Sequence, residues 1–266
     1  MRIKLYFILE NTKMPIDYRR SIISFIKLAL SDYSENEFKK YYNQKDNIIK
    51  PYAFSVFFRK PKINGEEIVI EDKKFEMNMT MENYETAITL YNAFNHQKDK
   101  KFSISQNSWK LQNIVLIPEK EIKDNKIVIK FQSPLCVRLR EENKDYYCSF
   151  ENEKFEETLK INIKEQLKIT NIPIESVDTL KIAPIKAKKV IIKFYEKQIE
   201  CSTGIFALEG EIELLKYLYR AGVGSKHSAR IRDVSNCLKG GAKLKIKVYL
   251  NDWFYNARNC RLFKNS

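Results

Sequence analysis

The order of expected strands and helices constrains the fold of this chain more than any single motif does. Residues 2–9 alternate apolar and polar side chains, as a strand with one buried face does, and residues 17–31 repeat apolar side chains at helical spacing. The same two patterns predict a helix at 35–42, a strand at 51–58, a hairpin of 66–71 with 75–81, a helix at 83–96, and strands at 111–117 and 126–131. This β-α-β-β-α-β order is that of a ferredoxin-like unit.

The same order recurs in the second half of the chain. Pro134 and the charged residues 140–144 mark the boundary. Beyond it the patterns predict a strand at 146–150, a helix at 154–168, strands at 189–195 and 198–209, and a helix from 211. We therefore expect an α+β fold of two tandem ferredoxin-like domains, at residues 1–140 and 141–229.

The last of these helices runs directly into a glycine-rich basic loop. Ile212, Leu215 and Tyr219 share one face of the helix. Glycines turn the backbone with positive φ and expose N–H groups, which suit phosphate when basic and hydroxyl side chains lie beside them. The candidate phosphate-contacting residues are Arg220, Gly222, Gly224, Ser225, Lys226 and Ser228. A plain helix C-cap would use the same glycines.

A helix ending in Tyr-Arg-x-Gly-x-Gly-Ser-Lys-x-Ser near the C-terminus resembles that of the CRISPR-associated endoribonuclease family that cuts precursor CRISPR RNA within its repeats (CRISPR-associated protein six). The resemblance implies two tandem RAMP-type ferredoxin-like domains. It also implies cleavage without a metal or cofactor, by attack of the 2′-hydroxyl, leaving a 2′,3′-cyclic phosphate and a 5′-hydroxyl. The implied partners are CRISPR repeat RNA, as precursor and as mature guide RNA, and a CRISPR effector complex.

The resemblance also points to three catalytic candidates. Residues 47–55 match a family segment in which a lysine precedes an aromatic strand, so Lys50 is expected to stabilise the phosphorane or protonate the leaving group. The usual general-base histidine falls on Tyr42, and a common helix-one tyrosine falls on Lys27. An ordinary tyrosine has a pKa near about 10, so Tyr42 needs neighbouring lysines to act as a base. Alternatively, Tyr42 only caps the helix end and packs.

A second basic segment precedes the strand at 189–195. Lys186, Lys188 and Lys189 alternate with apolar residues, as in a hairpin that enters the groove of an RNA stem. The alternative is a solvated edge strand that its lysines protect from aggregation. His96 is expected at the surface, and His227 lies in the glycine-rich loop but is a poor candidate for the base.

The chain departs from the family after Ala229. There the family loop continues as Gly, an apolar residue, Gly and a short apolar strand, whereas this chain reads Arg230-Ile-Arg-Asp-Val-Ser-Asn-Cys. With AT-rich codons, reading one base later gives Gly-Leu-Gly-Met-Phe-Arg-Ile-Val and a stop. We therefore expect residues 230–266 to be an out-of-frame, poorly ordered tail, and the second domain to lack its native last strand. The alternative is a native C-terminal extension.

Composition limits the classes of partner and compartment. The formal net charge is +14, and residues 230–266 contribute half of it with nine Lys or Arg and two Asp. Such a charge is compatible with a polyanionic partner. The five cysteines lack metal-site spacing and indicate free thiols in a reducing cytosol. No apolar run approaches about twenty residues, so we expect a cytoplasmic protein with no membrane segment.

Three functions stay open from the sequence. The first is the repeat-cutting nuclease; no carboxylate cluster at hard-cation spacing and no histidine-rich motif predicts a metal for it. The second is a repeat-binding subunit without cleavage activity, which the missing histidine and missing strand favour. The third is an unrelated RNA-binding protein of the same fold, because a fold does not determine a function.

Overall fold

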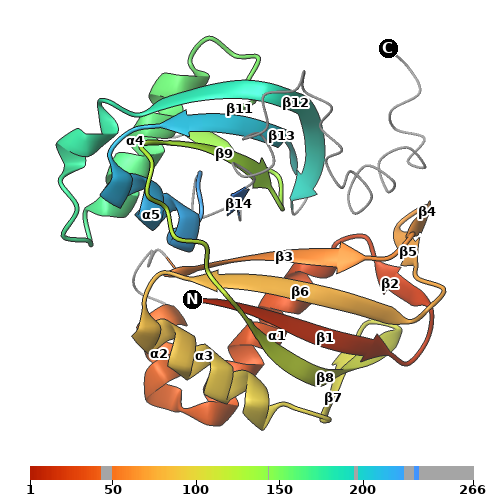
Figure 1. Cartoon of the computed structure of the whole chain (residues 1–266). Coiled ribbons are helices and arrows are strands. Elements are labelled where there is room, and N and C mark those ends of the chain that lie inside the picture. Colours follow the sequence, from red (N-terminus) through yellow and green to blue (C-terminus); the bar gives the residue numbers. More distant parts are fainter. Residues whose placement is uncertain (43–49, 143, 195–196, 225–230, 234–266) are drawn as a thin grey trace, which may run out of the picture.

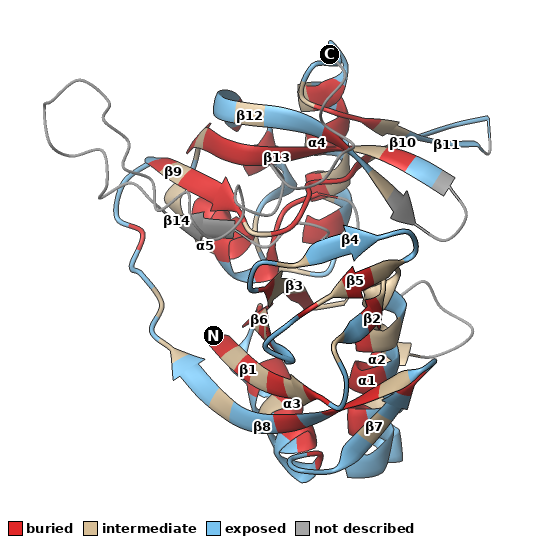
Figure 2. Ribbon diagram, turned by 90° about the vertical axis from the view of Figure 1, so that its right-hand side faces the viewer, coloured by how far each residue is buried: buried red, intermediate tan, exposed pale blue. Residues whose placement is uncertain are grey.

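The computed structural model describes residues 1–42, 50–142, 144–194, 197–224 and 231–233. Its buried apolar side chains form two main cores. The first gathers residues between Ile3 and Leu111, and the second gathers residues between Ile122 and Val223. In Figure 1 the two units lie one above the other, and Figure 2 shows buried strands in both. No helix in these ranges is long and apolar enough to cross a membrane.

The first unit is an antiparallel sheet of five strands in the order β3-β6-β1-β8-β7. Its strands are β1 (Arg2–Leu9), β3 (Tyr52–Phe58), β6 (Lys74–Met81), β7 (Lys101–Ile104) and β8 (Asn107–Ile117). Its helices are α1 (Tyr18–Tyr33), α2 (Glu35–Tyr42) and α3 (Tyr84–His96), and Figure 1 shows them together on one face of the sheet. Four strands follow the ferredoxin-like order, as predicted, and β7 adds an edge.

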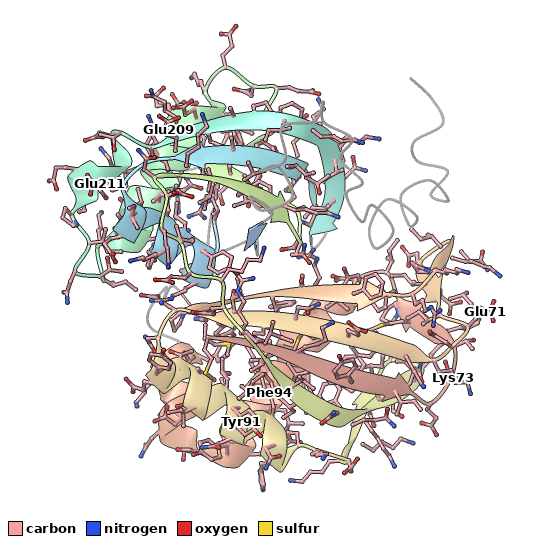
Figure 3. All side chains as sticks on the ribbon, in the orientation of Figure 1. Glu71, Lys73, Tyr91, Phe94, Glu209 and Glu211 are labelled. Carbon is pink, nitrogen blue, oxygen red and sulfur yellow. The ribbon has the colours of Figure 1, made fainter. Side chains whose placement is uncertain are left out.

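Apolar periodicity accounts for this packing. Ile3, Leu5 and Phe7 point into the core from β1, and α1 buries its own apolar stripe against them. Phe94, labelled in Figure 3, stacks on Phe25 with ring centroids 5.9 Å apart, which joins α3 to α1. Tyr41 of α2 contacts Tyr52 of β3 with ring centroids 6.5 Å apart, which places the end of α2 beside the beginning of β3.

One predicted pairing in this unit is wrong. Residues 66–71 were expected to form a hairpin with 75–81, but β5 (Glu67–Val69) pairs with β2 (Lys13–Pro15) and β4 (Lys62–Asn64) in a separate small sheet. A turn closed by Lys73 N–H on the Ile70 carbonyl (3.0 Å) separates β5 from β6. Alternation identifies strands but does not identify their partners.

The second unit has a sheet in the order β12-β13-β9-β14, which is again ferredoxin-like. The strands are β9 (Lys126–Phe131), β12 (Lys181–Phe194), β13 (Lys197–Glu209) and β14 (Ile231–Asp233). The helices are α4 (Phe155–Leu167), the short 3-10 helix η1 (Ile174–Val177) and α5 (Ile212–Ala221). Glu209 and Glu211, both labelled in Figure 3, flank the turn from β13 into α5. The two-domain α+β fold class is therefore confirmed.

The boundary between the units differs from the prediction. Residues 126–131 were assigned to the first domain, but β9 pairs with β13 and sends Ile127, Ile129 and Phe131 into the second core. The strand expected at 146–150 to open the second domain is instead β11 (Lys144–Cys148), which forms a two-stranded hairpin with β10 (Val137–Glu141). We therefore propose a boundary between Ile117 and Ile122 in place of residue 140.

The closing position of the second sheet is occupied. We expected the native last strand to be missing, yet β14 lies there, antiparallel to β9, with Ile231 opposite Phe131 and Asp233 opposite Ile129. This strand has only three residues, whereas β9 has six. The expected disorder of the tail concerns residues 234–266, which lie outside the described ranges.

Candidate functional site

Lys27, Tyr42 and Lys50 come from three different segments and lie together. Lys27 is on α1, Tyr42 is the last residue of α2, and Lys50 directly precedes Pro51 and β3. The Nζ atom of Lys50 is 4.8 Å from the centroid of the Tyr42 ring, and that of Lys27 is 5.0 Å from it. Both distances are typical of an ammonium attracted to an aromatic face. We call these three residues the lysine–tyrosine cluster.

The hydroxyl of Tyr42 has a different environment from its ring. It forms a short hydrogen bond with the hydroxyl of Tyr52, the first residue of β3. Burial raises the pKa of Tyr42 above its ordinary value, and the Tyr52 hydroxyl lowers it by less. Burial, and next the neighbouring Tyr42, raise the pKa of Tyr52 well above its ordinary value. Tyr42 is therefore a neutral phenol at neutral pH.

This environment bears on the two roles that the sequence left open for Tyr42. The ring also stacks on Phe38 with centroids 5.5 Å apart, so Tyr42 packs at the end of α2. Two lysines lie near the ring, as the role of Tyr42 as a base would require. The hydroxyl nevertheless stays protonated, because burial raises its pKa by more than the hydrogen bond with Tyr52 lowers it. The cluster is thus better suited to holding two cations near an anion than to abstracting a proton.

The glycine-rich loop begins as the sequence predicts. Gly222 caps α5 with φ 95° and donates its N–H to the Leu218 carbonyl at 3.0 Å, and Gly224 has φ 92°. Both glycines are in the left-handed region that side chains disfavour. The Nε of Arg220 lies 3.3 Å from a carboxylate oxygen of Glu119, so this arginine already has an anionic neighbour. Ser225, Lys226, His227 and Ser228 lie outside the described residues.

The end of α5 is fastened to the first unit. The guanidinium of Arg2, on β1, donates to the Tyr219 carbonyl at 2.7 Å and lies 3.7 Å from the centroid of the Tyr219 ring. Arg2 faces Thr80 across the sheet, and Thr80 faces Ala53, which is next to Tyr52. Helix α5 accordingly contacts β3 and β6, and Figure 1 shows its end above the beginning of β3. The loop and the lysine–tyrosine cluster are therefore on the same side of the molecule.

Comparison with known proteins finds a match for the second unit. Residues 117–229 match the family model described as CRISPR associated protein Cas6, C-terminal. The second unit is therefore similar to the C-terminal domain of Cas6 proteins. The match begins where the two cores divide and ends at Ala229, so it includes α5 and the glycine-rich loop.

Solved structures agree with this similarity at the level of the fold. One is described as an RAMP protein binding different RNA substrates (TM-score 0.74, 21% identity), and another as a Cas6-related gene product from Pyrococcus furiosus (0.73, 20%). A third is described as CRISPR associated protein Cas6 (0.67, 22%). Each comparison covers 88% of this chain and at least 98% of the other. No curated protein matches the chain.

The second basic segment lies at another part of the second unit. Lys186, Lys188 and Lys189 are exposed on β12, the edge of the sheet opposite to β14, whereas α5 contacts β14. Lys189 is 3.7 Å from Glu151 and 3.6 Å from Glu200. The structure therefore does not bring these lysines to the lysine–tyrosine cluster.

Sequence reasoning missed several residues that shape the site. Tyr52 was part of the matched segment, but nothing in its spacing indicates that its hydroxyl meets that of Tyr42. Arg2 and Glu119 were not noticed, because their partners on α5 are more than a hundred residues away. His96 is exposed, as expected, with Nε2 3.5 Å from the Nζ of Lys100. In the described ranges no three His, Cys, Asp or Glu side chains gather as metal ligands.

Proposed function

We propose that this chain is an endoribonuclease that cuts CRISPR repeat RNA without a metal to make guide RNAs. The observation that carries the proposal is the lysine–tyrosine cluster, in which two ammonium groups lie near one ring, on the same side of the molecule as the glycine-rich loop. The 2′-hydroxyl attacks the adjacent phosphate, which leaves a 2′,3′-cyclic phosphate and a 5′-hydroxyl. Lys50 and Lys27 stabilise the charge that develops on the phosphate oxygens.

RNA is held in this proposal by two basic regions. The backbone N–H groups that follow Gly222, together with Arg220 and Lys226, contact phosphates near the cut. The exposed lysines of β12 contact the stem, whose groove is recognised by shape and phosphates. Repeat RNA is the proposed partner as precursor and as mature guide, in the cytoplasm, with a CRISPR effector complex as a further partner.

A second candidate function is binding of repeat RNA without cleavage. The raised pKa of Tyr42 favours it, because a buried neutral phenol is a poor base. Incubation with a CRISPR repeat RNA in EDTA separates the two. Cutting supports the nuclease, and binding without cutting supports the alternative. A protein that neither cuts nor binds the RNA would contradict both functions.

We also propose that residues 230–266 are read out of frame. The Cas6 match stops at Ala229, the residue at which the frame argument places the slip. If a longer strand continued in the register of β14, its next three residues would lie opposite Val128, Ile127 and Lys126 of β9. The alternative frame supplies Phe-Arg-Ile at these positions, a pattern that suits a closing strand. Sequencing the locus tests this, since a continuous frame with other codons would contradict it.

A further inference from the structure

A buried amide of α4 touches the backbone of the glycine-rich loop. Gln166 lies in the last turn of α4, and its side chain is 1% exposed. Its Nε2 donates a short hydrogen bond to the carbonyl oxygen of Gly224. Only the NH₂ of the amide can donate to a carbonyl, so this contact fixes the orientation of the side chain.

The other end of this amide is available for a second contact. Within the described ranges Oε1 of Gln166 has no hydrogen-bond partner, although it is buried. A buried polar atom is costly unless it is paired. A carboxamide offers donors and an acceptor on one planar group, so Gln166 can hold the Gly224 carbonyl and still accept from a further donor.

The loop is a segment that needs such an anchor. Gly222 and Gly224 both have positive φ, and glycine loses more conformational freedom on ordering than any other residue. A loop that must become ordered on binding weakens the affinity for its ligand. Arg2 fixes the helix before the loop through Tyr219, and Gln166 fixes the chain where it leaves Gly224.

We propose that Gln166 is a positioning residue, which holds the backbone at Gly224 in the conformation that presents the N–H groups following Gly222 to RNA phosphate. The inference rests on the proposed function, because it assumes that this loop binds repeat RNA. Gln166 itself stays buried and does not touch the RNA. Its effect is therefore on the number of phosphate contacts that the loop makes.

The chain offers a matched control on the same helix. Asn162, one turn earlier on α4, accepts from the Arg138 N–H at 3.0 Å and donates to the Arg138 carbonyl at 2.8 Å. Its amide thus joins α4 to β10 and not to the loop. Loss of the Asn162 amide removes three hydrogen bonds and loss of the Gln166 amide removes one, but only the loss at Gln166 changes the support of the loop.

The experiment measures the affinity of the whole chain for a CRISPR repeat RNA over a range of salt concentrations. Gln166→Glu keeps the shape and removes the donor, and Gln166→Met removes both polar groups. We expect both to weaken binding about tenfold and to lower the salt slope by about one phosphate contact. Asn162→Leu should lower the melting temperature and leave affinity and slope unchanged.

Each result has a defined meaning. Gln166 variants that melt lower but keep the affinity and the salt slope would overturn the inference, since the amide would then serve stability alone. A wild-type chain that does not bind repeat RNA would contradict the proposed function instead. Hydrogen exchange at the Gly222 and Gly224 amides, measured without RNA, is a second readout. It should accelerate in Gln166→Glu, and unchanged exchange would also overturn the inference.

Discussion

At the scale of single residues, the lysine–tyrosine cluster is suited to stabilising negative charge and poorly suited to transferring a proton. The ring of Tyr42 attracts two ammonium groups, while its hydroxyl is buried against Tyr52. A protonated lysine near a phosphate stabilises negative charge and stays protonated. A tyrosine must first lose its hydroxyl proton before it can act as a base. In the proposed reaction Lys50 and Lys27 are therefore the groups that act on the phosphate, and the identity of the base is the weaker assignment.

Lys50→Ala should slow cleavage in single-turnover assays by about 10²–10³-fold, the loss expected for one contact to a developing anion. The affinity for repeat RNA should change little. Lys39→Ala is a matched control, because Lys39 is 63% exposed and pairs with Glu35 at 2.7 Å on the neighbouring α2. A wild-type rate for Lys50→Ala would remove this lysine from the site.

The pH dependence of the rate tests Tyr42. Because burial raises its pKa, the phenolate fraction grows about tenfold per pH unit through the neutral range. If Tyr42 is the base, the rate climbs with pH without reaching a plateau below about pH 9, and Tyr42→Phe abolishes cleavage. Tyr42→His should restore or raise activity and reach a plateau above about pH 7.

A control for the tyrosine variants is Tyr41→Phe, since the Tyr41 hydroxyl faces Thr86 at 3.4 Å and not the lysines. Normal cleavage by Tyr42→Phe would show that the base lies elsewhere, or that positioning alone drives the reaction.

At the scale of elements, the second sheet depends on features that side-chain patterns do not reveal. β12 has an irregularity between Pro184 and Lys186, and Gly204 of β13 lies opposite Ala187 just beyond it. Gly204 has φ 122°, and a Cβ there would clash with the Lys186 carbonyl oxygen and lie 2.9 Å from the Ala187 Cα. A glycine is therefore required where the edge strand bends.

Gly204→Ala should destabilise the protein by about 3 kcal/mol, because positive φ and a backbone clash act together. Gly65→Ala is the matched control, with φ 60° and nothing within 4 Å of the added Cβ. It should cost only about 1 kcal/mol. Thermal unfolding of both variants measures the difference, and equal losses would show that the sheet relaxes around the new methyl group.

The short closing strand gives a second prediction at this scale. Residues 1–229 followed by Gly-Leu-Gly-Met-Phe-Arg-Ile-Val should melt higher than the chain as it stands, because a longer strand adds hydrogen bonds along β9. Each bond contributes about 1 kcal/mol, and each kcal/mol raises the melting temperature by about 4–8 °C for a domain of this size. The repaired chain should also bind repeat RNA more tightly. Equal stability and affinity would mean that residues 230–266 are native.

At the scale of the whole molecule, the sequence predicts single helices and strands better than it predicts which strands and side chains contact one another. Periodicity located α2 at residues 35–42 and the two ferredoxin-like orders, because burial of one face depends only on spacing. It misassigned β9, since an apolar strand is suited to either core. Lys27, Tyr42 and Lys50 were found together through a family resemblance, whereas Tyr52 and Gln166 depend on contacts that tertiary packing creates.

The two units also depend on each other at this scale. Arg2 of the first unit supports the end of α5 in the second, next to the glycine-rich loop. A substrate that spans the loop and the lysine–tyrosine cluster would therefore contact both units at once. The central claim is that this combined surface cuts RNA with the substrate's own 2′-hydroxyl.

Single-turnover cleavage in EDTA tests that claim most directly, with a CRISPR repeat RNA and the same RNA carrying one 2′-deoxynucleotide on the 5′ side of the cut. The account predicts that both bind equally, that only the unmodified RNA is cut, and that the product ends in a 2′,3′-cyclic phosphate. Cleavage of the deoxy-substituted RNA at that position, or no cleavage of either RNA, would contradict it.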